Sequence, residues 1–237
     1  MADVKVSWGE STRLEIRYTG NLHGALDGLA RLATVIKQER ERHPGLVLMD
    51  TGNFSAGDPV TERFRGRPVA EVMQKLGFEA VLAGKDEVRW GLRGLAELEQ
   101  AAGCPVLAAN WAGSRGCTVL DKGGLKVRVV GMAWPEPPAG CESISPEDAL
   151  RKALEGSEGD EVVIVLSQLG FAQDRSLAML DDRIHVILEG VPYEGFSQVT
   201  RMGDTLIVPA SPGVASLGSL GLDLSGTLVI ETEVNGH

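Results

Sequence analysis

The chain alternates short unbroken apolar runs with segments whose apolar residues recur at helical spacing, and this alternation limits the possible folds more than any other feature. Runs such as GLVLMD (45–50) and DEVVIVLSQLG (160–170) lack a polar face, which is typical of strands buried on both sides of a sheet. Between the runs, segments such as 27–43 place Leu29, Leu32 and Ile36 on one helical face. The pattern predicts a layered α/β architecture.

The order of the expected elements refines this prediction. The first part of the chain has expected strands at 13–19, 45–50, 78–84 and 104–110, with helices at 27–43, 67–77 and 91–103. Residues 116–132 predict two strands joined by a tight turn at Gly123-Gly124. Further helices are expected at 147–156 and 173–180, strands at 160–170 and 184–190, and hairpins of alternating strands at 197–210 and 216–234. Parallel units followed by antiparallel hairpins favour an α/β sandwich with mixed sheets.

Composition excludes several classes of protein. The formal net charge of −10, with no basic cluster to offset it, repels nucleic acid. No stretch approaches the roughly 20 apolar residues of a membrane-spanning helix. Three cysteines without C-x-x-C spacing argue against a disulfide framework or zinc knuckle and are interpreted as small thiols in or near the core. The start shows no signal peptide, so we expect a cytoplasmic protein or the mature part of an exported one.

Polar and glycine-rich loops follow the predicted buried strands. In such folds, ligands bind at the carboxyl ends of the strands, so these loops are the candidate site. Each loop alone is typical of a simple turn, so only the order and spacing of the loops indicate a functional site. In sequence they are GNLHG (20–24), DTGNFSAGDP (50–59), GKDEVRWG (84–91), AANW (108–111), SQLG (167–170) and EGVPYEG (189–195).

In this order the loops resemble the catalytic domain of the 5′-nucleotidase branch of the calcineurin-like metallophosphoesterases. That family has N-D-L-H-G, D-x-G-D, G-N-H-E, S-H-x-G and G-H-x-H where this chain has GNLHG, DTGN, GKDE, SQLG and GVPY. The resemblance covers essentially the whole chain. It implies a four-layer α/β/β/α sandwich in one domain, 1–237, without the family's C-terminal nucleotide-specificity domain. It also implies phosphate-ester hydrolysis by two divalent metals.

The chain departs from the family at nearly every position that binds metal or acts in catalysis. Asn21 and Asn53 replace aspartates, Lys85 replaces the asparagine ligand, and Gln168, Val191 and Tyr193 replace histidines. Asp86 and Arg89 occupy the positions of the catalytic histidine and of the aspartate that assists it, while Glu87 and Asp50 are unchanged. His23 is the only retained residue of a metal-ligand type.

These replacements predict that the two-metal site does not form. The neutral amide of Asn53 brings no charge to bridge two dications, and the Lys85 ammonium repels a cation at close range. Val191 offers no donor atom. We therefore expect no cofactor, with manganese or zinc only in a divergent enzyme. We also expect the added positive charges of Lys85 and Arg89 to balance the pocket by pairing with Asp50, Asp86 or Glu87.

Several candidate residues have two interpretations. Lys85 and Arg89 fit a small anionic ligand or internal salt bridges, and His23 fits a weak metal shared with Asp86 or a hydrogen bond within its loop. Trp90 and Trp111 fit ring stacking or, more simply, core packing. The candidate ligand-binding set is Lys85, Arg89, Asn21, Asn53, Gln168 and Tyr193.

Three functional hypotheses follow. The favoured one is a non-catalytic binding or scaffold protein, with a protein partner or a small anionic ligand and no nucleic acid. The second is a divergent phosphoesterase that uses His23, Asp86 and Glu87 with one metal or none. The third is a structural or regulatory subunit of a larger assembly.

Overall fold

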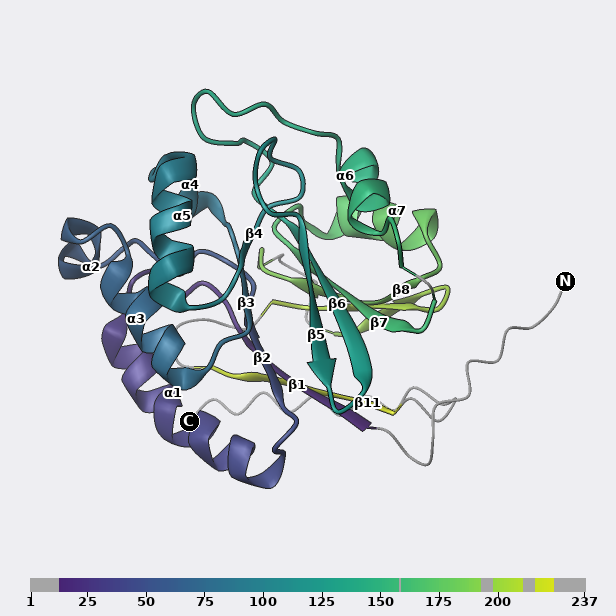
Figure 1. The fold of residues 1–237 in the computed structure, drawn as a ribbon, viewed down its shortest axis with the longest axis horizontal. Helices are drawn as coiled ribbons and strands as arrows, with labels where there is room; N and C mark the ends of the chain where they lie inside the picture. Colours follow the sequence, from purple (N-terminus) through teal and green to yellow (C-terminus); the bar gives the residue numbers. More distant parts are fainter. Residues whose placement is uncertain (1–12, 158, 193–197, 211–215, 224–237) are drawn as a thin grey trace, which may run out of the picture.

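Two β-sheets lie face to face between two layers of helices in the computed structural model, which describes residues 13–157, 159–192, 198–210 and 216–223 (Figure 1). The five-stranded sheet has the order β11-β1-β2-β3-β4 and the six-stranded sheet the order β5-β6-β7-β8-β10-β9. The strands of the first sheet are β1 Arg13–Thr19, β2 Val47–Asp50, β3 Ala80–Leu82, β4 Val106–Leu107 and β11 Gly218–Asp223. Those of the second are β5 Cys117–Lys122, β6 Leu125–Met132, β7 Glu161–Ser167, β8 Ile184–Glu189, β9 Thr200–Met202 and β10 Thr205–Val208.

Helices cover the outer face of each sheet. Side chains of α1, α3 and α5 pack on the first sheet, and those of α6 and α7 pack on the second (Figure 1). Including two short helices, the bounds are α1 Leu26–Arg42, α2 Pro59–Arg63, α3 Arg67–Leu76, α4 Lys85–Val88, α5 Gly91–Ala102, α6 Pro146–Ala153 and α7 Phe171–Leu180. The predicted four-layer α/β/β/α sandwich with mixed sheets is therefore confirmed.

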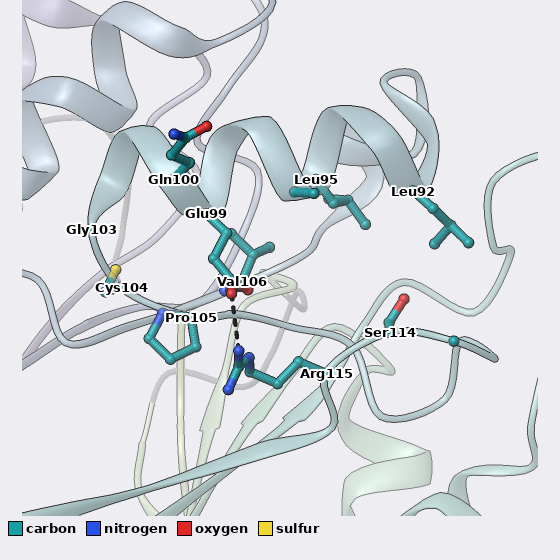
Figure 2. Close-up of a pocket in the computed structure, with 12 residues that line it drawn as sticks. Leu92, Leu95, Glu99, Gln100, Gly103, Cys104, Pro105, Val106, Ser114 and Arg115 are labelled. Carbon is teal, nitrogen blue, oxygen red and sulfur yellow. Dashed lines mark hydrogen bonds and ion pairs between the residues drawn. The ribbon is translucent and has the colours of Figure 1, made fainter.

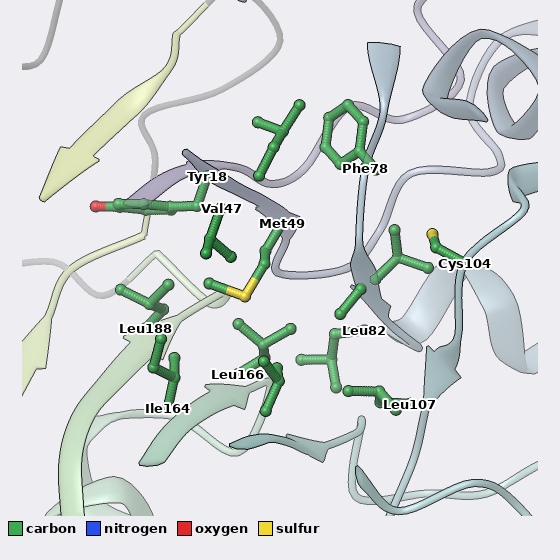
Figure 3. Packing of buried hydrophobic residues seen from close by; sticks show 14 of the residues in the cluster. Tyr18, Val47, Met49, Phe78, Leu82, Cys104, Leu107, Ile164, Leu166 and Leu188 are labelled. Atoms are coloured by element: carbon green, nitrogen blue, oxygen red, sulfur yellow. The ribbon is translucent and has the colours of Figure 1, made fainter. Parts of the chain in front are cut away.

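The strand β7 shows why its sequence lacks a polar face. Ile164 and Leu166 pack between the two sheets, whereas Val163 and Val165 pack under α6 and α7. Successive side chains of a strand point to opposite faces, so a strand with helices on one side and a sheet on the other is apolar throughout. Figure 3 shows the inter-sheet layer, where Met49 of the first sheet lies near Leu166 of the second.

Local signals set the ends of several elements, and those at Gly77 and at Gly123-Gly124 were predicted. Gly77 ends α3 in the left-handed conformation, with φ of 75°. Ser145 accepts a hydrogen bond from the Asp148 backbone N–H at the start of α6. The β5–β6 hairpin turns at Gly123 and Gly124, which have φ of 68° and 94°.

The segment 216–234 was expected to form a hairpin, and this prediction lies largely outside the described residues, which end at 223. Within the described part, β11 pairs antiparallel with β1, with Leu222 opposite Leu14, which the sequence did not predict. The short helices α2 and α4 were not predicted. Within the described residues, Trp111 and Cys104 are buried as expected and all three cysteines are thiols. No described helix has both the length and the apolarity to span a bilayer.

Candidate functional site

The predicted loops meet at one edge of the sandwich. The strands β1, β2 and β3 run parallel in the first sheet, and β6, β7 and β8 run parallel in the second. The loops after β1, β2 and β7 bring Asn21, Asn53 and Gln168 into direct contact. The loops that follow these buried strands therefore lie together, and their role in binding a ligand stays a prediction.

These three side chains form a closed amide cluster. Asn53 Nδ2 donates to Asn21 Oδ1 at 2.9 Å and to Gln168 Oε1 at 3.3 Å. Asn21 Nδ2 donates to the Gly190 carbonyl at 2.9 Å, and Gln168 Nε2 donates to the Thr51 carbonyl at 2.6 Å. Asn53 Oδ1 accepts from the Asp86 backbone N–H at 3.2 Å. Each amide oxygen of the cluster therefore already accepts a hydrogen bond from the protein.

The backbone of the first two loops is held in a left-handed conformation. Asn21, His23 and Asn53 have φ of 54°, 46° and 59°, a region that asparagine tolerates better than most side chains. Backbone hydrogen bonds join the loops, from Asn21 N to Gly52 O at 2.9 Å and from His23 N to Asn53 O at 2.8 Å. The loop geometry is thus fixed by main-chain contacts between the ends of β1 and β2.

Glu87 lies beneath the amide cluster as a buried internal anion. Its carboxylate accepts from four backbone N–H groups, those of Asn53, Phe54, Ser55 and Gly84, at 2.7 to 3.1 Å. Burial raises the pKa of Glu87, while the hydrogen bonds oppose the rise. The carboxylate therefore ties α4 to the loop after β2.

Asp50, at the end of β2, is a second buried carboxyl group. It accepts from Thr19 Oγ1 at 2.6 Å and from the Gly52 backbone N–H at 2.8 Å. Burial raises the pKa of Asp50 to about 7, with a smaller contribution from the charge of Glu87. Its two oxygens are occupied within the chain.

His23 and Asp86 form a pair at the exposed rim of the site. His23 Nδ1 and Asp86 Oδ2 lie 2.8 Å apart, and the imidazole is about half exposed at 52%. The imidazole therefore pairs with a residue of α4 and not within its own loop, which had been the simpler interpretation, and a metal shared with Asp86 stays a prediction. Asp86 is the second residue of α4, so its position depends on the same short helix that carries Glu87.

The partners expected for Lys85 and Arg89 were wrong. Arg89 Nη1 binds Glu62 of α2 at 2.9 Å, and both side chains are partly exposed. Lys85 is exposed, with Nζ 5.3 Å from the ring centroid of Trp134. Asp50 and Glu87 are buried and accept hydrogen bonds from nearby donors instead. We refer to the exposed side chains of Lys85, the first residue of α4, and Arg89, which directly follows this helix, as the cationic rim.

The remaining predicted residues lie in less informative places. Val191 is half-buried, and Tyr193 lies outside the described residues. Trp90 is half-buried, and its Nε1 donates to Ser55 Oγ at 2.8 Å, which favours the packing interpretation. The sequence analysis did not identify Thr19 as the partner of Asp50, or Thr51 and Gly190 as partners of the amide cluster. Thr51 and Gly190 contribute only backbone carbonyls to these hydrogen bonds, and every residue has one.

The donor set does not fit two divalent metals. The amide oxygens point to N–H groups of the cluster or of α4, and Lys85 brings positive charge to the rim. Among the described residues, no group of three or more His, Cys, Asp or Glu side chains is arranged to hold a metal ion. A dication would have to break the amide hydrogen bonds before it gained an oxygen ligand.

A cavity of about 570 Å³ lies elsewhere, between α5 and the loops around β4 (Figure 2). Leu92 and Leu95 line its upper wall, and Arg115 Nη2 binds Glu99 Oε1 at 3.2 Å. None of the predicted site residues lines this cavity. It is therefore a separate feature of the helix-covered edge of the first sheet.

Comparison with known proteins places this geometry in context. No protein-family model matches the chain. A snake venom 5′-nucleotidase of Gloydius brevicauda is 28% identical over 184 residues, covering 69% of this chain and 31% of the relative. The 5′-nucleotidase of Rattus norvegicus is 26% identical over 223 residues, covering 76% and 38%. The chain thus spans roughly a third of the length of these curated relatives.

Solved structures show the same fold. A 5′-nucleotidase precursor from Thermus thermophilus superposes with a TM-score of 0.81 at 22% identity, covering 94% of this chain and 54% of that one. The calcineurin-like phosphoesterase YfkN from Bacillus subtilis gives 0.74 at 19% identity, covering 94% and 90%. The resemblance predicted from the ordered loops is confirmed: the chain is similar in sequence to part of the curated 5′-nucleotidases, and it shares its fold with a solved 5′-nucleotidase precursor and a calcineurin-like phosphoesterase.

Proposed function

We propose that this chain is a metallophosphoesterase-like domain in which hydrogen-bonded amides replace the metals, and that it acts as a non-catalytic binding or scaffold protein. The amide cluster of Asn21, Asn53 and Gln168 carries this proposal. Its three side chains are buried, and each has hydrogen-bond partners within the cluster and on the neighbouring backbone, so the site is stable without the charge of a metal. A network whose members are all paired resists insertion of a new ligand.

The cationic rim supports a small anionic ligand. Lys85 Nζ has no carboxylate partner among the described residues, and the Arg89 pair with Glu62 is exposed enough to exchange with an incoming anion. Lys85 would supply a point charge and Arg89 a planar pair of donors to a phosphate or carboxylate group. Binding would then occur above the amide cluster without displacing it.

A divergent phosphoesterase is the second candidate, and the His23–Asp86 pair favours it. If His23 Nδ1–H donates to Asp86, His23 Nε2 becomes the acceptor that a general base needs. The relatives named 5′-nucleotidase support a hydrolase as the class of any such activity. Manganese or zinc would belong only to this second candidate.

Metal content and turnover, measured on the same samples, test the proposal. The purified protein is incubated with manganese or zinc, desalted and analysed for metal and for phosphate release from a generic phosphomonoester. We expect less than about a tenth of a metal ion per chain and no turnover above the blank. A protein retains a metal ion only when deprotonated ligands surround it in a suitable geometry, and the amide cluster does not provide them. Retained metal, together with turnover that is lost in His23→Ala, would instead establish the second candidate.

Anion binding is tested separately by titrating inorganic phosphate and following backbone amide signals by NMR. Lys85→Ala should weaken binding, whereas Arg67→Ala, which removes an exposed basic residue paired with Glu71, should not. Equal affinity of all three proteins would show that the rim is not an anion site.

A further inference from the structure

A second polar cluster lies on the opposite face of the strand ends that support the amide cluster. Gln168 and Gly190 follow β7 and β8 and contact the amide cluster. The preceding residues, Ser167 and Glu189, are the last of these strands. Because successive side chains alternate, Ser167 and Glu189 point toward α7, which contributes Asp174. Ser167 Oγ donates to Asp174 Oδ1 at 2.5 Å.

The two carboxyl groups of this second cluster lie against each other, and no described residue provides them with a basic partner. Asp174 and Glu189 are in side-chain contact and are 0% and 1% exposed. If both were ionised, Asp174 Oδ2 and both oxygens of Glu189 would have no hydrogen-bond donor among the described residues. Three unpaired acceptors in an apolar layer would be costly, whereas one shared proton supplies the missing O–H donor.

The described residues around the pair offer no other charge to balance it. β7 contributes the Ser167 hydroxyl, and the side chains that α6 and β10 place in this layer are apolar, such as Leu150 and Ile207. Glu147 of α6 accepts from Gln173, and Arg175 of α7 lies over the ring of Phe171. No ion pair joins a described basic side chain to Asp174 or Glu189.

We propose that Asp174 and Glu189 share one proton and, together with the Ser167 hydroxyl, form a latch that fastens the ends of β7 and β8 to α7 and thereby holds the amide cluster in place. The connection is direct, because the Gly190 backbone N–H donates to the Ser167 carbonyl at 2.7 Å and the Gly190 carbonyl accepts from Asn21. The latch does not depend on the proposed function, since it holds the strand ends whether or not the site binds a ligand.

The direction of the pH dependence follows from the burial of the pair. Burial, and then the neighbouring carboxyl group, raises the pKa of Glu189 to about 9, and burial raises that of Asp174 to about 6. In the unfolded chain both groups return to values near 4 and have lost their protons by neutral pH. Between about pH 6 and 9 unfolding therefore releases one proton from the pair, and the unfolding equilibrium constant rises about tenfold per pH unit.

Urea unfolding of the whole chain between pH 6 and 9 tests the latch. Other buried carboxyl groups contribute to the slope, so the comparison is between wild type and Glu189→Gln, whose amide keeps the shape and can donate to Asp174. We expect the unfolding constant of wild type to rise about 1,000-fold more across this range than that of Glu189→Gln. The release of one proton gives a factor of about ten for each of the three pH units. Glu155→Gln, at an exposed position, should keep the wild-type slope.

Two results would overturn the proposal. One is an identical dependence of the unfolding constant on pH in wild type and Glu189→Gln. If Glu189→Gln does not fold, Asp174→Asn provides the same comparison. The other is a rise in the wild-type midpoint on adding sodium, magnesium or calcium ions that is absent in Glu189→Gln, which would assign the unpaired oxygens to a cation.

Hydrogen exchange at the Gly190 amide tests the link to the amide cluster. After correction for the intrinsic pH dependence, protection at Gly190 should fall above about pH 9 in wild type and stay constant in Glu189→Gln. Constant protection in both proteins would show that the pair does not hold the end of β8.

Discussion

Replacing Asn53 with aspartate exchanges the central donor of the amide cluster for an acceptor. Asn53 Nδ2 donates to both Asn21 Oδ1 and Gln168 Oε1, so the variant leaves two buried acceptors facing a third. The backbone is not the cause of any loss, because aspartate also tolerates the left-handed φ of 59°. The effect of Asn53→Asp therefore measures the donor and the added charge.

The expected loss of stability is large. Each buried acceptor left unpaired costs about 1–3 kcal/mol, and the new carboxylate is 9% exposed or less beside the buried Glu87. Together these give about 3–5 kcal/mol, about a fifth or more of the stability of a typical domain. With a urea m-value of about 3 kcal/mol/M for a chain of this size, the midpoint should fall by more than about 1 M.

Urea unfolding at pH 5 and pH 8, with and without manganese, separates the possible outcomes. At pH 5 the buried carboxyl group is partly protonated and can donate one hydrogen bond, so the variant should be less destabilised than at pH 8. Gln100→Glu adds the same charge at an exposed helical position and should change the midpoint little. Recovery of wild-type stability by manganese would refute the reasoning, because Asn53→Asp would then have restored a metal ligand.

Three further predictions concern the groups around the cluster. Glu87→Gln should destabilise the protein by about 3 kcal/mol or more in urea unfolding, because the amide nitrogen would face backbone N–H donors; a loss below about 1 kcal/mol would contradict this. His23→Ala should change stability by less than about 1 kcal/mol, since its pair with Asp86 is exposed, and a larger loss would indicate a further role for the imidazole. The pKa of Asp50 is about 7 in the folded protein against 3.8 when unfolded, so the free energy of unfolding should fall as pH rises from about 4 to 7. Asp50→Asn should remove part of this pH dependence, and an unchanged dependence would exclude Asp50 as its source.

The fold could be predicted because its pattern is local. The run from Val162 to Leu166 is apolar at every position, which only a strand buried on both faces explains at that length. The pairing of β11 with β1 could not be predicted, because the two strands lie at opposite ends of the described chain and neither sequence indicates which strand its partner is. The helices α2 and α4, with five and four residues, are shorter than a helical periodicity can reveal.

The candidate site was predictable in membership but not in pairing. The ordered loops identified Asn21, Asn53 and Gln168, and the structure brings them together. The partner of Arg89 was not predictable, because Glu62 lies on the unpredicted helix α2. Asp174 resembles any acidic residue in a first helical turn, and only its burial beside Glu189 distinguishes it.

The asparagines at positions 21 and 53 fit the left-handed backbone, as aspartates would, and in addition they bring no negative charge to the site. Both positions require a left-handed backbone, which asparagine tolerates, and both lie near the buried carboxyl groups of Asp50 and Glu87. Four carboxylates in this space would repel one another unless cations were bound among them, whereas two amides supply donors and acceptors without charge. Reversing one asparagine therefore adds a charge without the remaining ligands, since Gln168 and Lys85 still occupy their positions. We infer that the loop geometry is retained by the hydrogen bonds themselves, and that any restoration of metal binding would require several of these positions to change together.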